Sequence, residues 1–180
     1  MTDLEIMQLC IDEARHAVEH GIGGPFGAAV VKDGVVIASG YNRVGVDQDP
    51  TAHGEVVAIR RAAKILGPQF PKGCVLFTTS QSCPMCVAAA LWAGIERIYY
   101  GASCEDGHRA GLSDKHVYDF LRGNEQKQTL EQIQVYQDLC REQVLKFWQR
   151  AYRQDGKMPG PELLRNNNLG ENGPLYFREN

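Results

Sequence analysis

The chain has 180 residues, of which 43% are hydrophobic and 23% charged, and its formal net charge is −3. These values predict one ordinary globular domain that is able to bury a sizeable core. They give no basic balance of the kind that nucleic-acid-binding domains carry, which argues against a nucleic-acid partner. No signal-peptide pattern opens the sequence and no apolar run reaches transmembrane length. We therefore expect a cytoplasmic protein with reduced thiols and no membrane partner.

The N-terminal part of the chain predicts a helix that leads into a β-hairpin. Thr2-Asp3-Leu4-Glu5 has the pattern of a capping box, and apolar residues recur at helical spacing until Gly21. Beyond the glycine-rich turn that follows, residues 28–31 and 35–38 are apolar and predict two strands. Asp33-Gly34 between them is a strong signal for a two-residue hairpin turn.

The first polar motif follows a polar loop at residues 45–50 and reads Thr51-Ala52-His53-Gly54-Glu55. It opens an apolar run to Leu66 that predicts a helix, which Gly67-Pro68 ends. His53 and Glu55, at positions i and i+2, do not share a helical face. They converge only on something beyond the helix tip, with Glu55 using its longer reach.

The second polar motif, Ser82-Cys83-Pro84-Met85-Cys86, opens another apolar helical run at residues 87–92. Short strands are predicted on either side of it, at 75–79 and 97–100. A strand, a helix and a strand in succession predict a parallel pair with a right-handed crossover, and therefore a mixed sheet with helices on both faces.

Together the two motifs supply one imidazole, two thiols and a spare carboxylate, which suits a zinc ion at two helix N-termini. Cys83 and Cys86, at i and i+3, share a helical face. Three protein ligands with an open fourth position are typical of catalytic zinc, whereas structural sites are closed by a fourth ligand. The alternatives are a redox pair at the two cysteines, or a structural site that is closed by one of four other residues: Cys74, Cys104, His108 and His116.

With these motifs the sequence resembles the cytidine-deaminase-like superfamily, whose signature is H-x-E followed by P-C-x-x-C. Gly54 stands where Ala is usual, Ser82 where Pro is usual, and Gln81 where many members have Glu. The resemblance implies one Zn²⁺ per chain on His53, Cys83 and Cys86, with Glu55 as the proton carrier. It also implies an α/β fold, a three-layer α/β/α sandwich around a mixed five-stranded sheet.

A second resemblance, to guanine deaminases, rests on Ala110-Gly111-Leu112-Ser113-Asp114, within a loop predicted at residues 102–114, and on the tyrosine-containing helix predicted after it. It implies that Asp114 reaches the active site, although an N-cap of that helix is an equal interpretation. It further implies that Phe26 packs on a purine base and that Asn42 hydrogen-bonds the polar edge of the base. Trp92 is a candidate wall of the substrate pocket, with a place in the core or at an interface as alternatives.

Towards the C-terminus we expect a last strand at 130–136 and an amphipathic helix at 140–152. After Gln154 the sequence is rich in Gly, Pro and Asn, which predicts a zinc domain at residues 1–153 and a flexible arm at 154–180. The resemblance implies a homodimer, in which C-terminal segments are exchanged between the partners.

The function that these patterns favour is zinc-dependent hydrolytic deamination of a purine base in purine metabolism, with guanine converted to xanthine and ammonia. Deamination of another amino-substituted ring (guanosine, cytosine, a pterin or a triazine) is an alternative, as is deamination of adenosine in tRNA. A zinc-stabilised binding module without turnover is the alternative from a different class. The discriminating feature is the fourth position on the metal, which is either a protein ligand or an exchangeable water.

Overall fold

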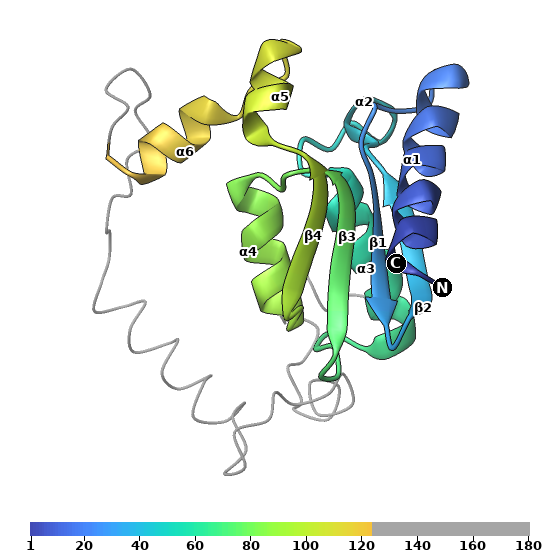
Figure 1. Cartoon of the computed structure of the whole chain (residues 1–180). Helices are drawn as coiled ribbons and strands as arrows, with labels where there is room; N and C mark the ends of the chain where they lie inside the picture. Colours follow the sequence, from blue (N-terminus) through green and yellow to red (C-terminus); the bar gives the residue numbers. More distant parts are fainter. Residues whose placement is uncertain (124–180) are drawn as a thin grey trace, which may run out of the picture. The chain divides into compact units, whose positions relative to one another are not determined.

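A mixed sheet with the strand order β2-β1-β3-β4 forms the centre of residues 1–123, the part of the chain that the computed structural model describes (Figure 1). β1 runs antiparallel to both β2 and β3, whereas β3 and β4 are parallel. The predicted mixed sheet is therefore confirmed. The strands are β1 (Gly27–Lys32), β2 (Val35–Tyr41), β3 (Cys74–Ser80) and β4 (Arg97–Ala102). The predicted fifth strand, the helix at 140–152 and the arm at 154–180 lie outside the described residues.

The predicted hairpin joins β1 to β2. Asp33 and Gly34 have φ angles of 50° and 73°, the positive values that a tight two-residue turn requires at both positions. Farther along, the register shifts by one residue, because Val30 pairs with Ala38 whereas Val31 pairs with Val36. Ile37 is the extra residue of this bulge, which twists and bends the edge of the sheet.

Helices cover both faces of the sheet (Figure 1). α1 (Asp3–Glu19) packs on one face, where Ile6 and Cys10 meet Ala29 and Val31 of β1. α3 (Gly54–Leu66) and α4 (Pro84–Ala93) pack on the other face, against Ala28 and Val30. Neighbouring residues of β1 thus point to opposite layers, as the period of a strand dictates, and the three-layer α/β/α prediction is confirmed.

α1 begins at the predicted capping box. The Glu5 backbone N–H donates to Thr2 Oγ1 at 3.3 Å, and the Thr2 N–H donates to Glu5 Oε2 at 2.8 Å. The predicted unit of β3, α4 and β4 is also present, with its two strands paired in parallel from Val75 and Arg97 onwards. Within residues 1–123 no helix is both long and apolar enough to cross a membrane.

Two predicted loops contain helices. The polar loop after β2 includes the single turn α2 (Val44–Asp47). The stretch after β4 includes α5 (Cys104–Arg109), which begins at a second capping box, formed by Ser103 and Asp106. That Ser-x-x-Asp pattern is a helix signal which the loop prediction missed. α6 (Lys115–Leu121) follows at the place where a helix was predicted.

Candidate active site

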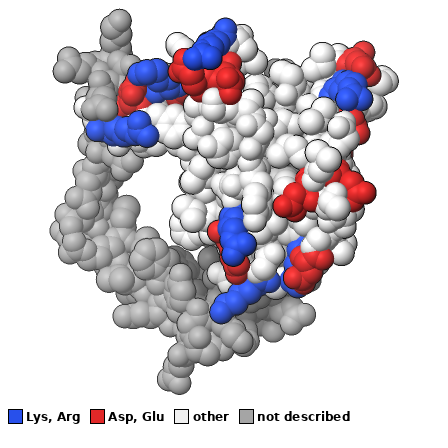
Figure 2. All heavy atoms as spheres, viewed as in Figure 1, with Lys and Arg blue, Asp and Glu red and all other residues white. Residues whose placement is uncertain are grey.

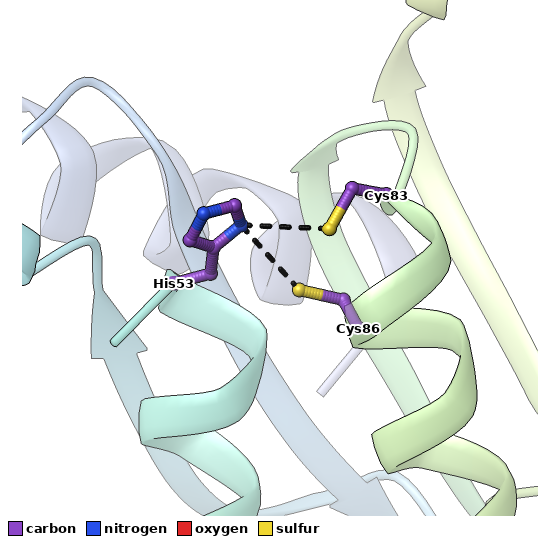
Figure 3. Close-up of side chains that lie close together, drawn as sticks. All are labelled: His53, Cys83 and Cys86. Carbon is purple, nitrogen blue, oxygen red and sulfur yellow. Dashed lines mark hydrogen bonds between the residues drawn. The ribbon is translucent and has the colours of Figure 1, made fainter. Parts of the chain in front are cut away.

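The three metal-binding side chains come from the first residues of two neighbouring helices (Figure 3). His53 is the N-cap of α3 and Cys83 is the N-cap of α4, and both have the extended backbone of a cap residue. Cys86 follows in the first turn of α4. Val56 packs with the two cysteines and so joins the two helix ends. Positive helix ends of this kind stabilise thiolates.

The geometry of these side chains fits zinc. His53 Nδ1 lies 3.6 Å from Cys83 Sγ and 3.6 Å from Cys86 Sγ, and the three atoms all lie within 4.8 Å of one another (Figure 3). A tetrahedral ion with Zn–N near 2.0–2.1 Å and Zn–S near 2.3 Å places its nitrogen and sulfur ligands about 3.6 Å apart. The described side chains therefore stand at the separation that a zinc ion imposes.

The electrostatics of the triad favour a metal-binding thiolate at Cys83, whereas the pKa of Cys86 is raised, chiefly by its hydrogen bond with Cys83. The pKa of Cys83 is lowered to about 4, chiefly by a hydrogen bond from Cys86 and also by the neighbouring His53. The pKa of His53 is raised, chiefly by its hydrogen bond with Cys83. The thiolate is the form of cysteine that binds metals.

Within residues 1–123 no fourth metal-ligating atom joins the triad. Cys74, a candidate for closing the site, is fully buried at the start of β3. Cys104 and His116 line the cavity beside the triad, and neither they nor His108 belong to it. In the described part of the chain the site thus has three ligands, the pattern of catalytic zinc.

Glu55 is the second residue of α3 and lies in its first turn. Its side chain is only 6% exposed, and it lines the cavity together with His53 and Cys83. Burial raises its pKa, while its own backbone N–H and Ser82 act in the opposite direction. A buried carboxylate beside a metal site is suited to accepting and returning protons.

A cavity of about 490 Å³ opens above the triad and Glu55. Small-molecule sites commonly have volumes of about 300–1,000 Å³. Its wall is formed by loops at the ends of the strands and by residues of α5 and α6. In addition to residues named above, the lining includes Phe26, Asn42, Pro50, Ser80, Gln81, Pro84, Met85, Gly107, Leu112, Ser113, Asp114 and Val117.

Phe26 and Asn42 are held together against the start of α3. The Asn42 backbone N–H donates to the Phe26 carbonyl oxygen at 2.8 Å. Gly54 lies directly beneath, because a Cβ atom built there would lie only 2.8 Å from that oxygen. The glycine in the His-Gly-Glu motif thus allows the two predicted substrate contacts to approach the metal helix closely.

Asp114 lines the cavity and also stands at the N-cap of α6. Its side chain makes no capping hydrogen bond there. Asp114 therefore occupies the N-cap position, but its carboxylate does not cap the helix. α6 is attached to the metal loop through Tyr118, whose hydroxyl donates to the Ser82 carbonyl oxygen at 2.7 Å.

The structure does not bring Trp92 to the cavity. Its side chain is 83% exposed in the last turn of α4, and it is not among the lining residues. The physical reason is the helix itself. Nine residues at a rise of about 1.5 Å separate it from Cys83 by about 13 Å along the axis. Within the described residues Trp92 thus lies outside the cavity, and its place at an interface stays a prediction.

Two features of the wall were not singled out as functional from sequence. Gln81 lines the cavity and accepts the Cys104 backbone N–H, and Tyr118 ties α6 to the metal loop. The departure of Gln81 from the family signature was the available signal for the first. The second depends on a contact between residues 36 positions apart, which no local pattern indicates.

The family described as the cytidine and deoxycytidylate deaminase zinc-binding region matches residues 1–102. The chain belongs to this family, and the prediction of a zinc-dependent deaminase is confirmed. The guanine deaminase of Bacillus subtilis (strain 168) is 43% identical over 122 residues, which are 68% of this chain and 78% of that protein.

The X-ray structure of the Bacillus subtilis guanine deaminase is similar with a TM-score of 0.74 and 37% identity, over 82% of this chain and 95% of that one. The tRNA-specific adenosine deaminase of Agrobacterium fabrum is 44% identical over 101 residues, 56% of this chain and 66% of that protein. Members of the family that match this chain therefore include enzymes named for a free base and enzymes named for tRNA.

Proposed function

We propose that this deaminase acts on a purine base, with guanine as its substrate and xanthine and ammonia as its products. The observation that carries the proposal is one cavity, beside the metal triad, that is lined by His53 and Cys83 of the triad and by Glu55, Phe26, Asn42 and Asp114. It is supported by the 43% identity to a protein named guanine deaminase.

In the proposed reaction Glu55 moves the protons. His53, Cys83 and Cys86 would hold the zinc ion, which would supply Lewis-acid chemistry that lowers the pKa of water toward roughly 7. Glu55 accepts a proton as the water oxygen bonds to the amine-bearing carbon, C2 of guanine. It passes that proton to the ring nitrogen, then takes the proton of the newly attached hydroxyl and gives it to the amine, so that a carbonyl forms, the C–N bond breaks and ammonia leaves. Burial keeps bulk water away from this carboxylate during the transfers.

The remaining residues would bind and orient the ring. Phe26 offers an aromatic face for stacking, and Asn42 an amide for the polar edge of the base. Asp114 lines the cavity with a carboxylate that does not cap α6, and this carboxylate can accept a hydrogen bond from the amine that is released. The proposed roles divide the cavity into a reacting side and a recognising side.

A panel of amino-substituted rings tests the substrate. Purified zinc-loaded protein is supplied with guanine, guanosine, cytosine, a pterin and a triazine, and ammonia release is measured. We expect guanine to give the highest kcat/KM. A higher kcat/KM for any other ring would replace guanine as the proposed substrate, and ammonia release from none of them by zinc-loaded protein would favour the binding-module alternative.

Deamination of adenosine in tRNA is the second candidate, because of the 44% identity to a tRNA-specific adenosine deaminase. The net charge of −3 argues against it. On the face of the described residues in Figure 2, Lys and Arg alternate with Asp and Glu and form no basic surface. A tRNA stem-loop belongs in the same assay, and inosine formation without deamination of guanine would reverse the assignment.

The assembly and the setting of the enzyme are also proposals. A homodimer with exchanged C-terminal arms, working in cytoplasmic purine metabolism, is motivated by the Gly-, Pro- and Asn-rich stretch that ends in Leu175-Tyr176-Phe177. Cyclic two-fold dimers are the commonest assemblies and make a reciprocal exchange natural.

Deletion of residues 155–180 tests the arm and the boundary proposed at 153/154. We expect a higher KM or a lower kcat with the zinc content unchanged. Unchanged kinetics in a truncated protein that light scattering still finds dimeric would show that the arm has no part in the site.

A further inference from the structure

Gln81 occupies the short connection between β3 and α4, immediately before the metal loop. Its backbone N–H donates to the Ala102 carbonyl oxygen at 2.8 Å, at the end of β4. Its side-chain Oε1 accepts the backbone N–H of Cys104, the first residue of α5, at 3.1 Å. Gln81 is thus fixed at both its backbone and its side chain, and it lines the substrate cavity.

These contacts determine the polarity that Gln81 presents. The Cys104 backbone N–H can only donate, so the Gln81 atom that it contacts is the amide oxygen. The other polar atom of the Gln81 side chain is therefore the Nε2 amino group. Among residues 1–123 this Nε2 has no hydrogen-bond partner. The amide therefore offers a donor within a cavity where the neighbouring carboxylates of Glu55 and Asp114 offer acceptors.

The amide of Asn42 has the same polarity. The Val44 backbone N–H donates to Asn42 Oδ1 at 3.3 Å, which leaves Asn42 Nδ2 as the available group. The cavity thus contains two side-chain amides, each held through its oxygen and each presenting N–H donors. A ring that carries a carbonyl oxygen beside an unprotonated ring nitrogen can accept hydrogen bonds from these donors. A ring with an amino group in place of the carbonyl presents a donor to them instead.

We infer that Gln81 is a specificity-determining residue, whose Nε2 donates a hydrogen bond to an oxo group or ring nitrogen of the substrate and so selects oxo-substituted amino rings over diamino rings. The inference rests on the proposed function, in that guanine is the oxo-substituted ring in question. Glutamate, which the family signature often has at this position, would accept the Cys104 N–H equally well. It would offer the substrate an acceptor and a negative charge instead of a donor.

This difference makes Gln81→Glu the decisive variant, because it keeps the attachment to α5 and reverses the polarity that faces the substrate. Gln81→Leu removes both the attachment and the donor. Gln8→Glu adds the same charge on the exposed side of α1, outside the cavity, and serves as the matched control. Dissociation constants for guanine and for 2,6-diaminopurine are measured by calorimetry in zinc-loaded Glu55→Gln protein with and without each change.

We expect Gln81→Glu to weaken guanine about tenfold or more and to leave 2,6-diaminopurine unchanged or tighter, since a mispaired polar group in a binding site is strongly rejected. Gln81→Leu should weaken guanine without favouring the diamino ring, and Gln8→Glu should leave the ratio as it was. Equal weakening of both rings by Gln81→Glu and Gln81→Leu would show that Gln81 only anchors α5, and an unchanged ratio in Gln81→Glu would equally overturn the inference.

The proposed function and this inference fail separately. The ring panel on the unmodified enzyme decides whether guanine is the substrate. If a different oxo-substituted ring replaces guanine, the same comparison with its amino-substituted analogue still tests Gln81. Reversal of the preference would support the inference, and an unaltered preference would contradict it.

Discussion

The two sides of the cavity are built in different ways. On the metal side, Cys83, Cys86 and Glu55 are buried, and the helices that carry them pack on the central sheet. On the opposite side, α5 and α6 bury no residue, and the hydrogen bonds at Cys104 and Tyr118 tie them to the metal loop. Elements with few buried contacts open most readily. The zinc ligands and Glu55 are thus fixed by the core, whereas α5 and α6, with Asp114 between them in the sequence, form a loosely held wall.

Loss of a metal ligand should be the most severe change. We expect Cys86→Ala to abolish zinc binding and activity, a larger loss than the about 10- to 100-fold that removal of an outer hydrogen-bond partner of a ligand costs. Elemental analysis and ammonia release measure the two effects. Cys74→Ala, which truncates a cysteine that is equally buried but lies outside the triad, is the control and should retain zinc. Full activity in metal-free protein would end the mechanism.

Glu55→Gln should cause the second largest loss of activity. It preserves the shape of the side chain and removes its capacity to carry protons, so we expect a loss of at least ~10²-fold in kcat with the zinc retained. Single-turnover kinetics on zinc-loaded protein provide the measurement. Turnover close to that of the unmodified enzyme would contradict the proton-carrying role.

Gly54→Ala should act on the metal side, where Phe26 and Asn42 lie against the start of α3. The added Cβ would meet the Phe26 carbonyl oxygen at 2.8 Å, which forces the strand ends that carry Phe26 and Asn42 outward. We expect the free energy of unfolding to fall by about 1–3 kcal/mol, as overpacking does, and KM to rise. Gly45→Ala, where a Cβ meets nothing within 4 Å, is the control for both measurements. Identical stability and KM in the two variants would refute the close-packing argument.

Tyr118→Phe should have the smallest effect and the one most confined to the loosely held wall. It removes the hydrogen bond to the Ser82 carbonyl oxygen, a contribution of about 0.5–1.5 kcal/mol. We expect KM to rise by about 2- to 12-fold while kcat and zinc content change little. Hydrogen exchange should also increase across α5 and α6.

Tyr100→Phe, at a half-exposed tyrosine of β4, provides the comparison for Tyr118→Phe. Should Tyr118→Phe lower kcat and leave both KM and exchange unaltered, the division between a fixed metal side and a loosely held wall would be wrong.

The features that could be predicted from sequence are those written in local patterns. The capping box at Thr2, the hairpin turn at Asp33-Gly34 and the unit around α4 each depend on neighbouring residues, and the structure has all of them. The zinc prediction was also local. Each of two short motifs opens a helix, and the N-termini of these two helices bring the ligands together.

The wall of the cavity could be predicted less well. Gln81 presents a donor to the cavity because its oxygen is bound by Cys104, which is 23 positions away. No local sequence pattern indicates such a hydrogen bond. A loop was predicted where α5 lies, although Ser103 and Asp106 have the pattern of a capping box.

The order of the ligands along the chain has a consequence for biosynthesis. His53 precedes Cys83 by 30 positions and Cys86 by 33, and β3 lies between them. Chains emerge from the ribosome N-terminus first. A nascent chain therefore carries the imidazole and Glu55 for the time needed to make β3, with no thiol of the triad to pair with. A product that is cut short before β3 would display His53 without either cysteine of the triad beside an unpaired edge of β1, and it would expose that edge to other chains until it is degraded.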